Sequence, residues 1–264
     1  MFSWSFNLFR IRGIQLAVHF TFLLLLGWAA YEGYEDTGIP GMLWSAATLI
    51  AFFTCVVLHE LGHSFTGMRY GVHVHRILLM PIGGMAQFDA IHRKPSQELL
   101  MTLAGPAVNF AIAGILWPIV NMGRWDPSGT PASFADIGRY LAAANIVMGL
   151  FNLIPVFPMD GGRILRALLA TRLDYLRATK IASLIGKVLA ILAIAWSIYV
   201  GHYLLAALFT FILGAGDAEY RAVKRDEAAR THWEEMLKHI SHAPAAADEP
   251  PLLEPKKPDW ELMP

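Results

Sequence analysis

The amino-acid sequence predicts an all-α polytopic membrane protein with about six transmembrane helices and a small membrane-associated β-hairpin between the second and third helices. Hydrophobic residues make up 55% of the 264 positions and charged residues only 16%, against about 25% charged residues in a typical soluble domain. The mean hydropathy is +0.44. So few charges cannot cover the water-facing surface of a soluble chain of this length, and we expect the lipid bilayer to surround most of it.

Net charge and cysteine content exclude other classes of protein. The 21 basic residues balance 21 acidic ones, so a nucleic-acid partner has no electrostatic support and none is expected. Cys55 is the single cysteine, which rules out an intramolecular disulfide framework and a cysteine-based zinc site. These counts leave an integral membrane protein as the predicted class.

Six apolar segments approach the roughly 20 residues that a helix needs to cross the hydrocarbon core. In chain order they are Gln15–Tyr31, Met42–Thr66, Met101–Met122, Ile137–Phe157, Ile181–Val200 and Tyr203–Ala215. A cleavable signal peptide is an alternative for the first segment, but bulky Trp28 and Tyr31 do not suit a cleavage site. The sixth is short, so it is a complete span only if it is tilted or merged with the fifth.

Basic residues concentrate in alternate connections between these segments. They precede the first segment, separate the second from the third and the fourth from the fifth, and follow the sixth: Arg10, Arg12, Arg69, Arg76, Arg93, Lys94, Arg163, Arg166, Arg172, Arg177, Lys180, Arg221, Lys224 and Arg225. By the positive-inside rule both termini lie in the cytoplasm, which requires an even number of spans. We expect a multi-pass protein of a bacterial or archaeal cell (inner) membrane.

The sequence divides into three parts by composition. Residues 1–216 form the predicted membrane core. Residues 217–240 are rich in helix formers with sparse apolar positions, which predicts a polar cytoplasmic helix. Residues 241–264 hold repeated prolines and small residues between charges, which is typical of a disordered tail.

The connection between the second and third segments is too apolar for an ordinary cytoplasmic loop. Val72, Val74, Arg76 and Leu78 alternate, and Gly83-Gly84 follows, a pattern that predicts two strands joined by a tight turn. An ordinary loop remains the alternative. An exposed strand edge here would allow an extended peptide to add as a further strand.

An H-E-x-x-H motif lies at the end of the second segment, at residues 59–63. On a helix His59 and His63 lie on one face, one turn apart, so both imidazoles can reach one metal ion. Glu60 points away from them and can hydrogen-bond a water at the metal's open position. Ionisable groups inside a membrane are costly and are functional candidates by default, which argues against an accidental string.

A third ligand is expected, because catalytic zinc usually has three protein ligands and a water. Asp160 follows the fourth segment, which leaves the membrane on the same predicted side as His59. Pro155 and Pro158 break the helix before it, and Gly161-Gly162 permits a turn. The alternative is that Asp160 only caps the next helix.

These motifs resemble those of the site-2 proteases, intramembrane zinc metalloproteases that cut within membrane-spanning segments. H-E-L-G-H at 59–63, A-G-P-A-V-N at 104–109 and N-L-I-P…M-D-G-G at 152–162 correspond to the family's three motifs, with Met159 where leucine is more usual. The resemblance covers most of residues 10–216. It implies one Zn²⁺ per chain held by His59, His63 and Asp160, with Glu60 as the catalytic acid and base and Asn152 orienting the substrate.

The resemblance also implies that the hairpin lies near the active site. The substrate-binding candidates are Gly83, Gly84, Met85, Ala86, Gln87, Phe88 and Asn109. For Asn109, hydrogen bonding to a peptide or to broken backbone competes with a simple packing role in a stretch of small residues.

The function expected from the sequence is zinc-dependent hydrolysis of a peptide bond in or near the transmembrane segment of a substrate protein. Two alternatives use the same residues differently. A non-proteolytic metal-binding transporter or sensor would need the ligands but not Glu60 as a base. A silent helix-binding scaffold would need neither, so the complete set of His59, Glu60, His63 and Asp160 argues against it.

Overall fold

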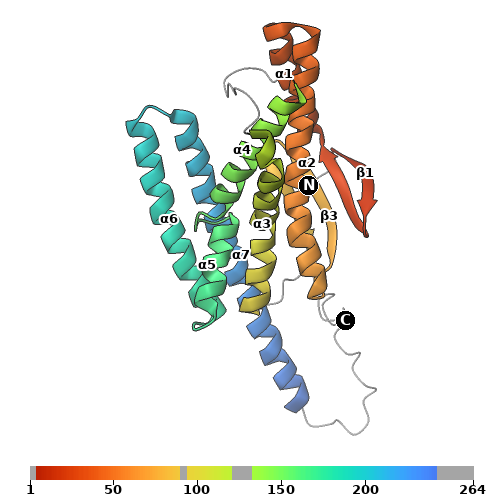
Figure 1. The fold of residues 1–264 in the computed structure, drawn as a ribbon. Coiled ribbons are helices and arrows are strands. Elements are labelled where there is room, and N and C mark those ends of the chain that lie inside the picture. Colours follow the sequence, from red (N-terminus) through yellow and green to blue (C-terminus); the bar gives the residue numbers. More distant parts are fainter. Residues whose placement is uncertain (1–3, 90–93, 121–132, 243–264) are drawn as a thin grey trace. The chain divides into compact units, whose positions relative to one another are not determined.

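The computed structural model describes residues 4–89, 94–120 and 133–242. Its elements are β1 (Ser5–Ile11), β2 (Ile14–His19), α1 (Phe20–Thr37), α2 (Ile39–Arg69), β3 (Val74–Met80), β4 (Gly83–Phe88), α3 (Pro95–Val120), α4 (Phe134–Asn152), α5 (Asp160–Ala170), α6 (Tyr175–Tyr199) and α7 (Tyr203–His242) (Figure 1). The chain forms two compact units, residues 1–154 and 155–264.

Helices α1 and α2 form an antiparallel hairpin in the first unit (Figure 1). They approach closely where Gly33 faces Gly41, because a β-carbon on either residue would overlap the backbone of the other helix. Small residues at such crossings let membrane helices pack backbone to backbone. The long helix α2, which carries residues 59–63, is thereby held along its first half.

A four-stranded sheet packs against α2 in the order β1-β2-β3-β4. β2 pairs parallel with β3, and the two outer pairs are antiparallel. The crossover between the parallel strands consists of α1 and α2. Side chains from β2, β3 and both helices share one core: Ile14, Leu16, Val18, Phe22, Phe53, Val56, Val57, Leu61, Val74, Ile77 and Leu79. β4 is an outer strand of this sheet, and no strand among the described residues pairs with its other edge, which is called its open edge below.

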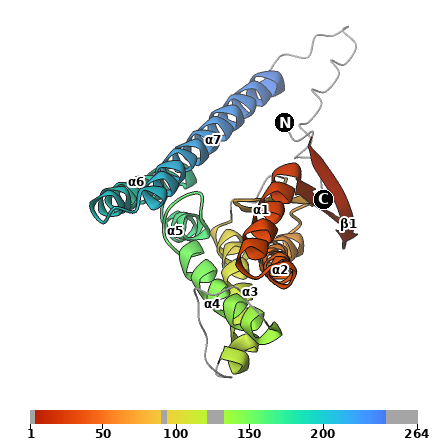
Figure 2. The ribbon, with the colours of Figure 1, turned by 90° about the horizontal axis from the view of Figure 1, so that it is seen from above.

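Helix α3 lies between α2 and α4 in the first unit (Figure 2). Gly62 of α2 lies against the main chain of α3, since a β-carbon there would come 2.8 Å from the Ala104 carbonyl oxygen. Gly149 of α4 makes a similar approach to the Phe110 ring. These contacts bring side chains of three helices together in one buried layer.

The second unit consists of α5, α6 and α7. Helices α6 and α7 are antiparallel neighbours (Figure 1), joined at Gly201, whose φ of +80° favours a glycine. Asp217 of α7 pairs with Lys187 of α6, with 2.5 Å between Oδ1 and Nζ. α7 continues without interruption from its apolar beginning into the polar residues after 216, so the predicted polar helix is the second part of a longer one.

Among the described residues, four helices are long and apolar enough to cross a membrane: α2, α3 up to Pro118, α4 and α6. The predicted polytopic, mostly helical architecture is thus confirmed, whereas the count of six spans is not. α1 carries Glu32, Glu35 and Asp36 near its end, and α7 is polar over most of its length.

The predicted first span, Gln15–Tyr31, was wrong at its beginning. Residues 14–19 form β2, and the chain becomes helical only at Phe20, where the His19 imidazole caps the helix by accepting from the Thr21 amide. Since β1 and β2 were not foreseen, the sheet is larger than the predicted hairpin. The fourth predicted span, Ile137–Phe157, also extended too far, because α4 ends at Asn152.

The predicted hairpin between α2 and α3 is confirmed as β3 and β4. Its turn lies at Pro81-Ile82, and Gly83-Gly84 begin β4 instead of forming the turn. The predicted disordered tail, 241–264, falls almost entirely outside the described residues. The division of the chain at residue 216 stays a prediction.

Candidate metal centre and active site

His59 and His63 lie one turn apart on α2 and are both buried, at 5% and 8% exposure. Their Nε2 atoms are 3.1 Å apart, and their ring centroids are 4.7 Å apart. Two imidazole nitrogens bound to one tetrahedral zinc ion are about 3.3 Å apart, given Zn–N bonds of about 2.05 Å. The helix therefore brings the two nitrogens to the separation that a shared metal ion requires.

The outward nitrogens of both rings face hydrogen-bond acceptors. The His63 Nδ1 lies 2.8 Å from the Met101 carbonyl oxygen of α3. The His59 Nδ1 lies 2.5 Å from the Asn109 Oδ1, also on α3. Because these oxygens can only accept, each Nδ1 carries the proton and each Nε2 keeps its lone pair for a metal. Metal-binding histidines characteristically have such a second partner, so this pair fits zinc.

Gly105 of α3 forms the wall behind both imidazoles. A β-carbon at this position would overlap the His63 Nε2 and would come 2.8 Å from the His59 Cε1. The helix can approach the rings only because residue 105 has no side chain. The single glycine of A-G-P-A-V-N therefore leaves the space that the histidine pair occupies.

Glu60 lies on a different face of α2, next to the outer strand of the sheet. A β-carbon on Gly84 of β4 would come 2.7 Å from the Glu60 Cγ and 3.2 Å from its Oε1. Gly84 therefore leaves room for the carboxylate beside the strand. The structure thus brings the predicted acid and base together with the predicted substrate-binding strand, in which all residues from Gly83 to Phe88 are half-buried.

Asn109 is fully buried and bonded at both ends of its amide. Its Oδ1 faces His59, and its Nδ2 donates to the Asn145 Oδ1 of α4 at 2.8 Å. Contact between Asn109 and substrate stays a prediction, but its place behind His59 was not foreseen. Asn145 was missed altogether. Its signal was a lone amide inside an apolar run, which marks a functional candidate in a membrane segment.

Asn152 and Asp160 flank the break that the prolines predict. Asn152 is the last residue of α4 and donates its Nδ2 to the Met148 carbonyl oxygen at 3.0 Å. Asp160 is the first residue of α5 in the second unit. The predicted alternative, that Asp160 caps a helix, is not what the structure has, because Met159 is the N-cap residue and Asp160 lies inside the first turn.

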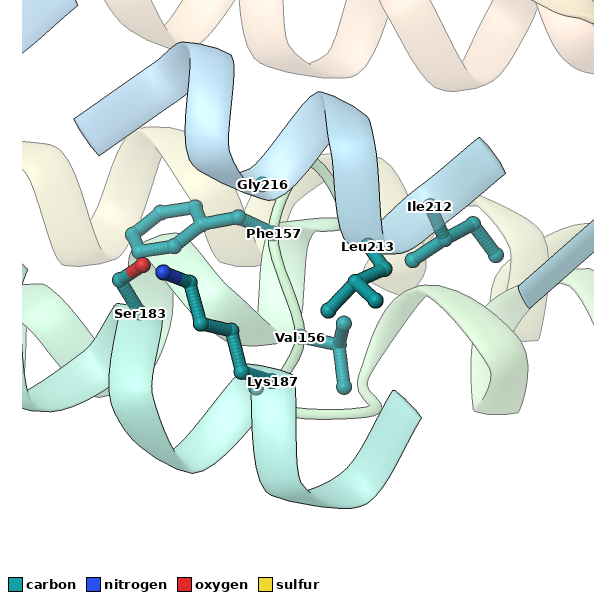
Figure 3. A pocket seen from close by; sticks show the side chains of 8 residues that line it. Val156, Phe157, Ser183, Lys187, Ile212, Leu213 and Gly216 are labelled. Atoms are coloured by element: carbon teal, nitrogen blue, oxygen red, sulfur yellow. The ribbon is translucent and has the colours of Figure 1, made fainter. Parts of the chain in front are cut away.

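The segment before Asp160 is clamped within the second unit. Figure 3 shows Val156 and Phe157 between α6 and α7. Phe157 is 1% exposed, and Gly162, Gly186 and Gly216 all lie against residues 156–157. A small cavity beside them is lined by Val156, Phe157, Ser183, Gly186, Lys187, Ile212, Leu213 and Gly216. Three glycines, one each from α5, α6 and α7, thus allow these helices to pack closely on the segment that precedes Asp160.

Arg166 of α5 adds a charged contact to this clamp. Its guanidinium lies 5.3 Å from the Phe157 ring centroid and 5.0 Å from that of Tyr175, and it pairs with Glu219 at 3.3 Å. Arg166 is only 2% exposed, so the aromatic rings and the carboxylate replace its hydration. The sequence offered no signal for this arrangement, which depends on the packing of α7.

Comparisons with known proteins agree with this site. The sequence profile of peptidase family M50 matches residues 47–126 and 128–193. The chain is 38% identical, over 84% of its own length, to a zinc metalloprotease of Methanocaldococcus jannaschii, and 28% identical over 91% to Rip3 of Mycobacterium tuberculosis. It spans only 62% and 63% of the lengths of these two relatives.

A solved structure is also similar. The site-2 protease from Methanocaldococcus jannaschii matches with a TM-score of 0.60 and 38% identity, over 82% of this chain and 95% of the solved one. The profile match contains residues 59–63, 104–109 and 152–162, which are the three motifs of the sequence.

Proposed function

The chain belongs to peptidase family M50, and on this premise we propose that it is an intramembrane zinc metalloprotease. The reaction is hydrolysis of a peptide bond in or near the transmembrane segment of another membrane protein. The observation that carries the proposal is the histidine pair of α2, whose Nε2 atoms are 3.1 Å apart while each Nδ1 is turned to an acceptor. The lipid bilayer is the expected environment of both enzyme and substrate.

One zinc ion per chain is held by His59, His63 and Asp160 in this proposal. Two nitrogens and one carboxylate oxygen are a usual ligand set for catalytic zinc and leave a fourth position for water or substrate. Support for the histidines comes from their geometry. Support for Asp160 comes from its place in the third motif, at the first turn of α5 behind the clamped segment 156–157.

Glu60 acts as the general base and then as the general acid. When bound, zinc supplies a Lewis acid for the scissile carbonyl and lowers the pKa of a water to about 7. The Glu60 carboxylate accepts a proton from the attacking water and delivers it to the nitrogen of the departing amine. Asn152 orients the peptide near the scissile bond.

The substrate peptide adds to the open edge of β4, through residues Gly83–Phe88. A helical substrate has its backbone hydrogen bonds closed internally, so it must unwind before its carbonyl can be attacked. Pairing with an edge strand compensates the freed backbone groups. Gly84 supports this route, because the strand passes directly beside Glu60 there.

The proposed topology has six spans with both termini in the cytoplasm. In addition to the four long apolar helices, α1 and the apolar part of α7 cross the bilayer in this topology. Its test uses a Cys55→Ala protein with single cysteines introduced at Asp36 and at Arg172, both exposed. A membrane-impermeant thiol reagent added outside intact cells should label position 36 and leave position 172 unlabelled. Labelling of position 172 alone would invert the topology.

The decisive experiment compares Glu60→Gln with the intact protein in cells that express a reporter with one transmembrane segment. We expect zinc content to stay stoichiometric while cleavage falls by about 10²–10⁴-fold, since both proton transfers are lost. Glu32→Gln, at an exposed position of α1, is the matched control and should cleave normally. If the protein is instead a metal-binding transporter, sensor or scaffold, no cleavage that depends on Glu60 is expected. That result would refute the proposed protease function.

A further inference from the structure

We propose that Asn145 is a positioning residue of the metal centre, which selects the tautomer of His59 through Asn109. The inference rests on the proposed function in one respect, namely that His59 binds zinc. It concerns residues that lie entirely in the first unit and on three different helices, α2, α3 and α4.

The three side chains form a continuous chain of hydrogen bonds that ends on a backbone carbonyl. The Asn145 Nδ2 donates to the Leu141 carbonyl oxygen one turn earlier on α4, at 2.8 Å. The Asn145 Oδ1 accepts from the Asn109 Nδ2 at 2.8 Å, and the Asn109 Oδ1 faces the His59 Nδ1 at 2.5 Å. Both asparagines are 0% exposed, and His59 is 5% exposed.

The Leu141 carbonyl oxygen determines which atom donates and which accepts in every hydrogen bond of this chain. A backbone carbonyl can only accept, so the Asn145 amide must turn its nitrogen to Leu141 and its oxygen to Asn109. Asn109 must then present its nitrogen to Asn145 and its oxygen to His59. The proton of His59 consequently resides on Nδ1, and the lone pair of Nε2 is available to the metal.

His63 reaches the same tautomer by a different route. Its Nδ1 donates directly to the Met101 carbonyl oxygen, which no side-chain substitution can reverse. The tautomer of His59 depends instead on two side-chain amides: the Leu141 carbonyl fixes Asn145, but Asn109 can flip when Asn145 is lost. Mutation of a side chain can therefore change the tautomer of His59, whereas the tautomer of His63 should stay the same in every variant.

A carboxylate in place of Asn109 provides the test of this mechanism. Both of its oxygens accept, so it has no orientation for Asn145 to set. In this chain of hydrogen bonds from Asn145 through Asn109 to His59, called the relay below, Asn109→Asp should therefore compensate for the loss of Asn145. In Asn109→Asp alone, the carboxylate meets the Asn145 Oδ1, which is itself an acceptor, so this single variant should bind zinc less well than the double variant.

The experiment measures zinc affinity of the full-length protein in detergent by competition with a chelating indicator, together with the visible spectrum of the Co²⁺-substituted protein. Asn145→Leu, Asn145→Ala, Asn109→Asp and Asn109→Asp/Asn145→Leu are compared with wild type. Thr48→Val is the matched control, because it removes a buried hydroxyl whose bond stays within α2. Thermal unfolding of each protein without metal separates folding from binding.

Loss of Asn145 should lower zinc affinity by about 10- to 100-fold, the usual effect of removing a partner behind a metal ligand. It should also change the Co²⁺ spectrum, and the double variant should bind more tightly than either Asn145→Leu or Asn109→Asp alone. Unchanged zinc affinity in both Asn145 variants, or a double variant no better than Asn145→Leu, would overturn the relay. His59→Ala, measured in the same assay, tests the metal site separately: full zinc binding by this variant would refute the proposed site and not only the relay.

Discussion

Two faces of the same helix, α2, are built in opposite ways. The face with His59 and His63 is buried against α3, with glycine main chain behind the rings and an acceptor for each Nδ1. The face with Glu60 borders β4, a half-buried outer strand with an open edge. Rigid helix packing thus holds the two proposed histidine ligands, while the proposed base lies beside the strand with which we propose that a substrate peptide pairs. Metal binding and cleavage should therefore respond to different substitutions.

The largest effect is expected for Gly105→Ala. Its methyl group overlaps the His63 Nε2 and crowds His59, so zinc affinity should fall by at least about 100-fold, more than a partner behind a ligand contributes, and cleavage should be lost with it. Gly114→Ala on the same helix is the control, because its β-carbon meets nothing within 4 Å. Zinc analysis of both purified proteins is the measurement. Full zinc binding by Gly105→Ala would show that the two helices separate easily.

A smaller and more selective effect is expected for Gly84→Ala. The atoms nearest the new β-carbon belong to Glu60 and Val56, and not to a histidine, so we expect Glu60 to be displaced and zinc to remain bound. Cleavage should fall by about 100-fold, the cost of moving a catalytic group by roughly 1 Å. Gly27→Ala in α1, where the β-carbon has open space, should behave as wild type. Parallel loss of zinc and activity in Gly84→Ala would mean that the two faces are not independent.

The third prediction concerns the open edge of β4 and pairs Met85→Pro with Ala86→Pro. Neighbouring amides in a strand point to opposite sides, so one proline removes a bond to β3 and the other removes a donor from the open edge. The variant that loses the donor on the open edge should retain zinc and wild-type thermal stability, which identifies it. Its cleavage should fall by roughly tenfold, the effect of a single lost backbone hydrogen bond of about 1–1.5 kcal/mol. If the variant with wild-type stability cleaves at the wild-type rate, substrate does not pair with this edge.

Sequence reasoning identified the metal-binding face of α2 but not what holds it in place. H-E-x-x-H needs only helical spacing to bring two imidazoles together, and the hairpin needs only alternation and turn residues. The relay through Asn145 depends on the rotation of α3 and α4 about their axes. A lone amide such as Asn109 or Asn145 marks a candidate residue on each helix, but no local pattern in these mostly apolar helices specifies which side chain it meets.

For the N-terminal strands the prediction was wrong about the secondary structure itself. Residues 14–19 lie in an apolar run that continues to residue 31, and composition alone does not distinguish a buried strand from a membrane helix. What decides the outcome is long-range pairing of β2 with β3 and the cap at His19. A local signal was present in Gly13, because Arg12 and Gly13 form the turn between β1 and β2 with positive φ values, but the prediction of the first span did not use it.

The parallel pairing of β2 with β3 also has a consequence for the order of assembly. β2 is synthesised first, but the strand it needs emerges only after α1 and the whole of α2. Until then β1 is the one described strand available to pair with β2, and β4, which pairs with β3, follows β3 in the chain. Because α2 precedes β3 and β4 in the chain and non-local contacts form slowly, the proposed peptide-binding edge is completed only after the helix with Glu60 has been synthesised. A nascent chain therefore lacks the edge on which we propose that substrate pairs until the proposed base is already present.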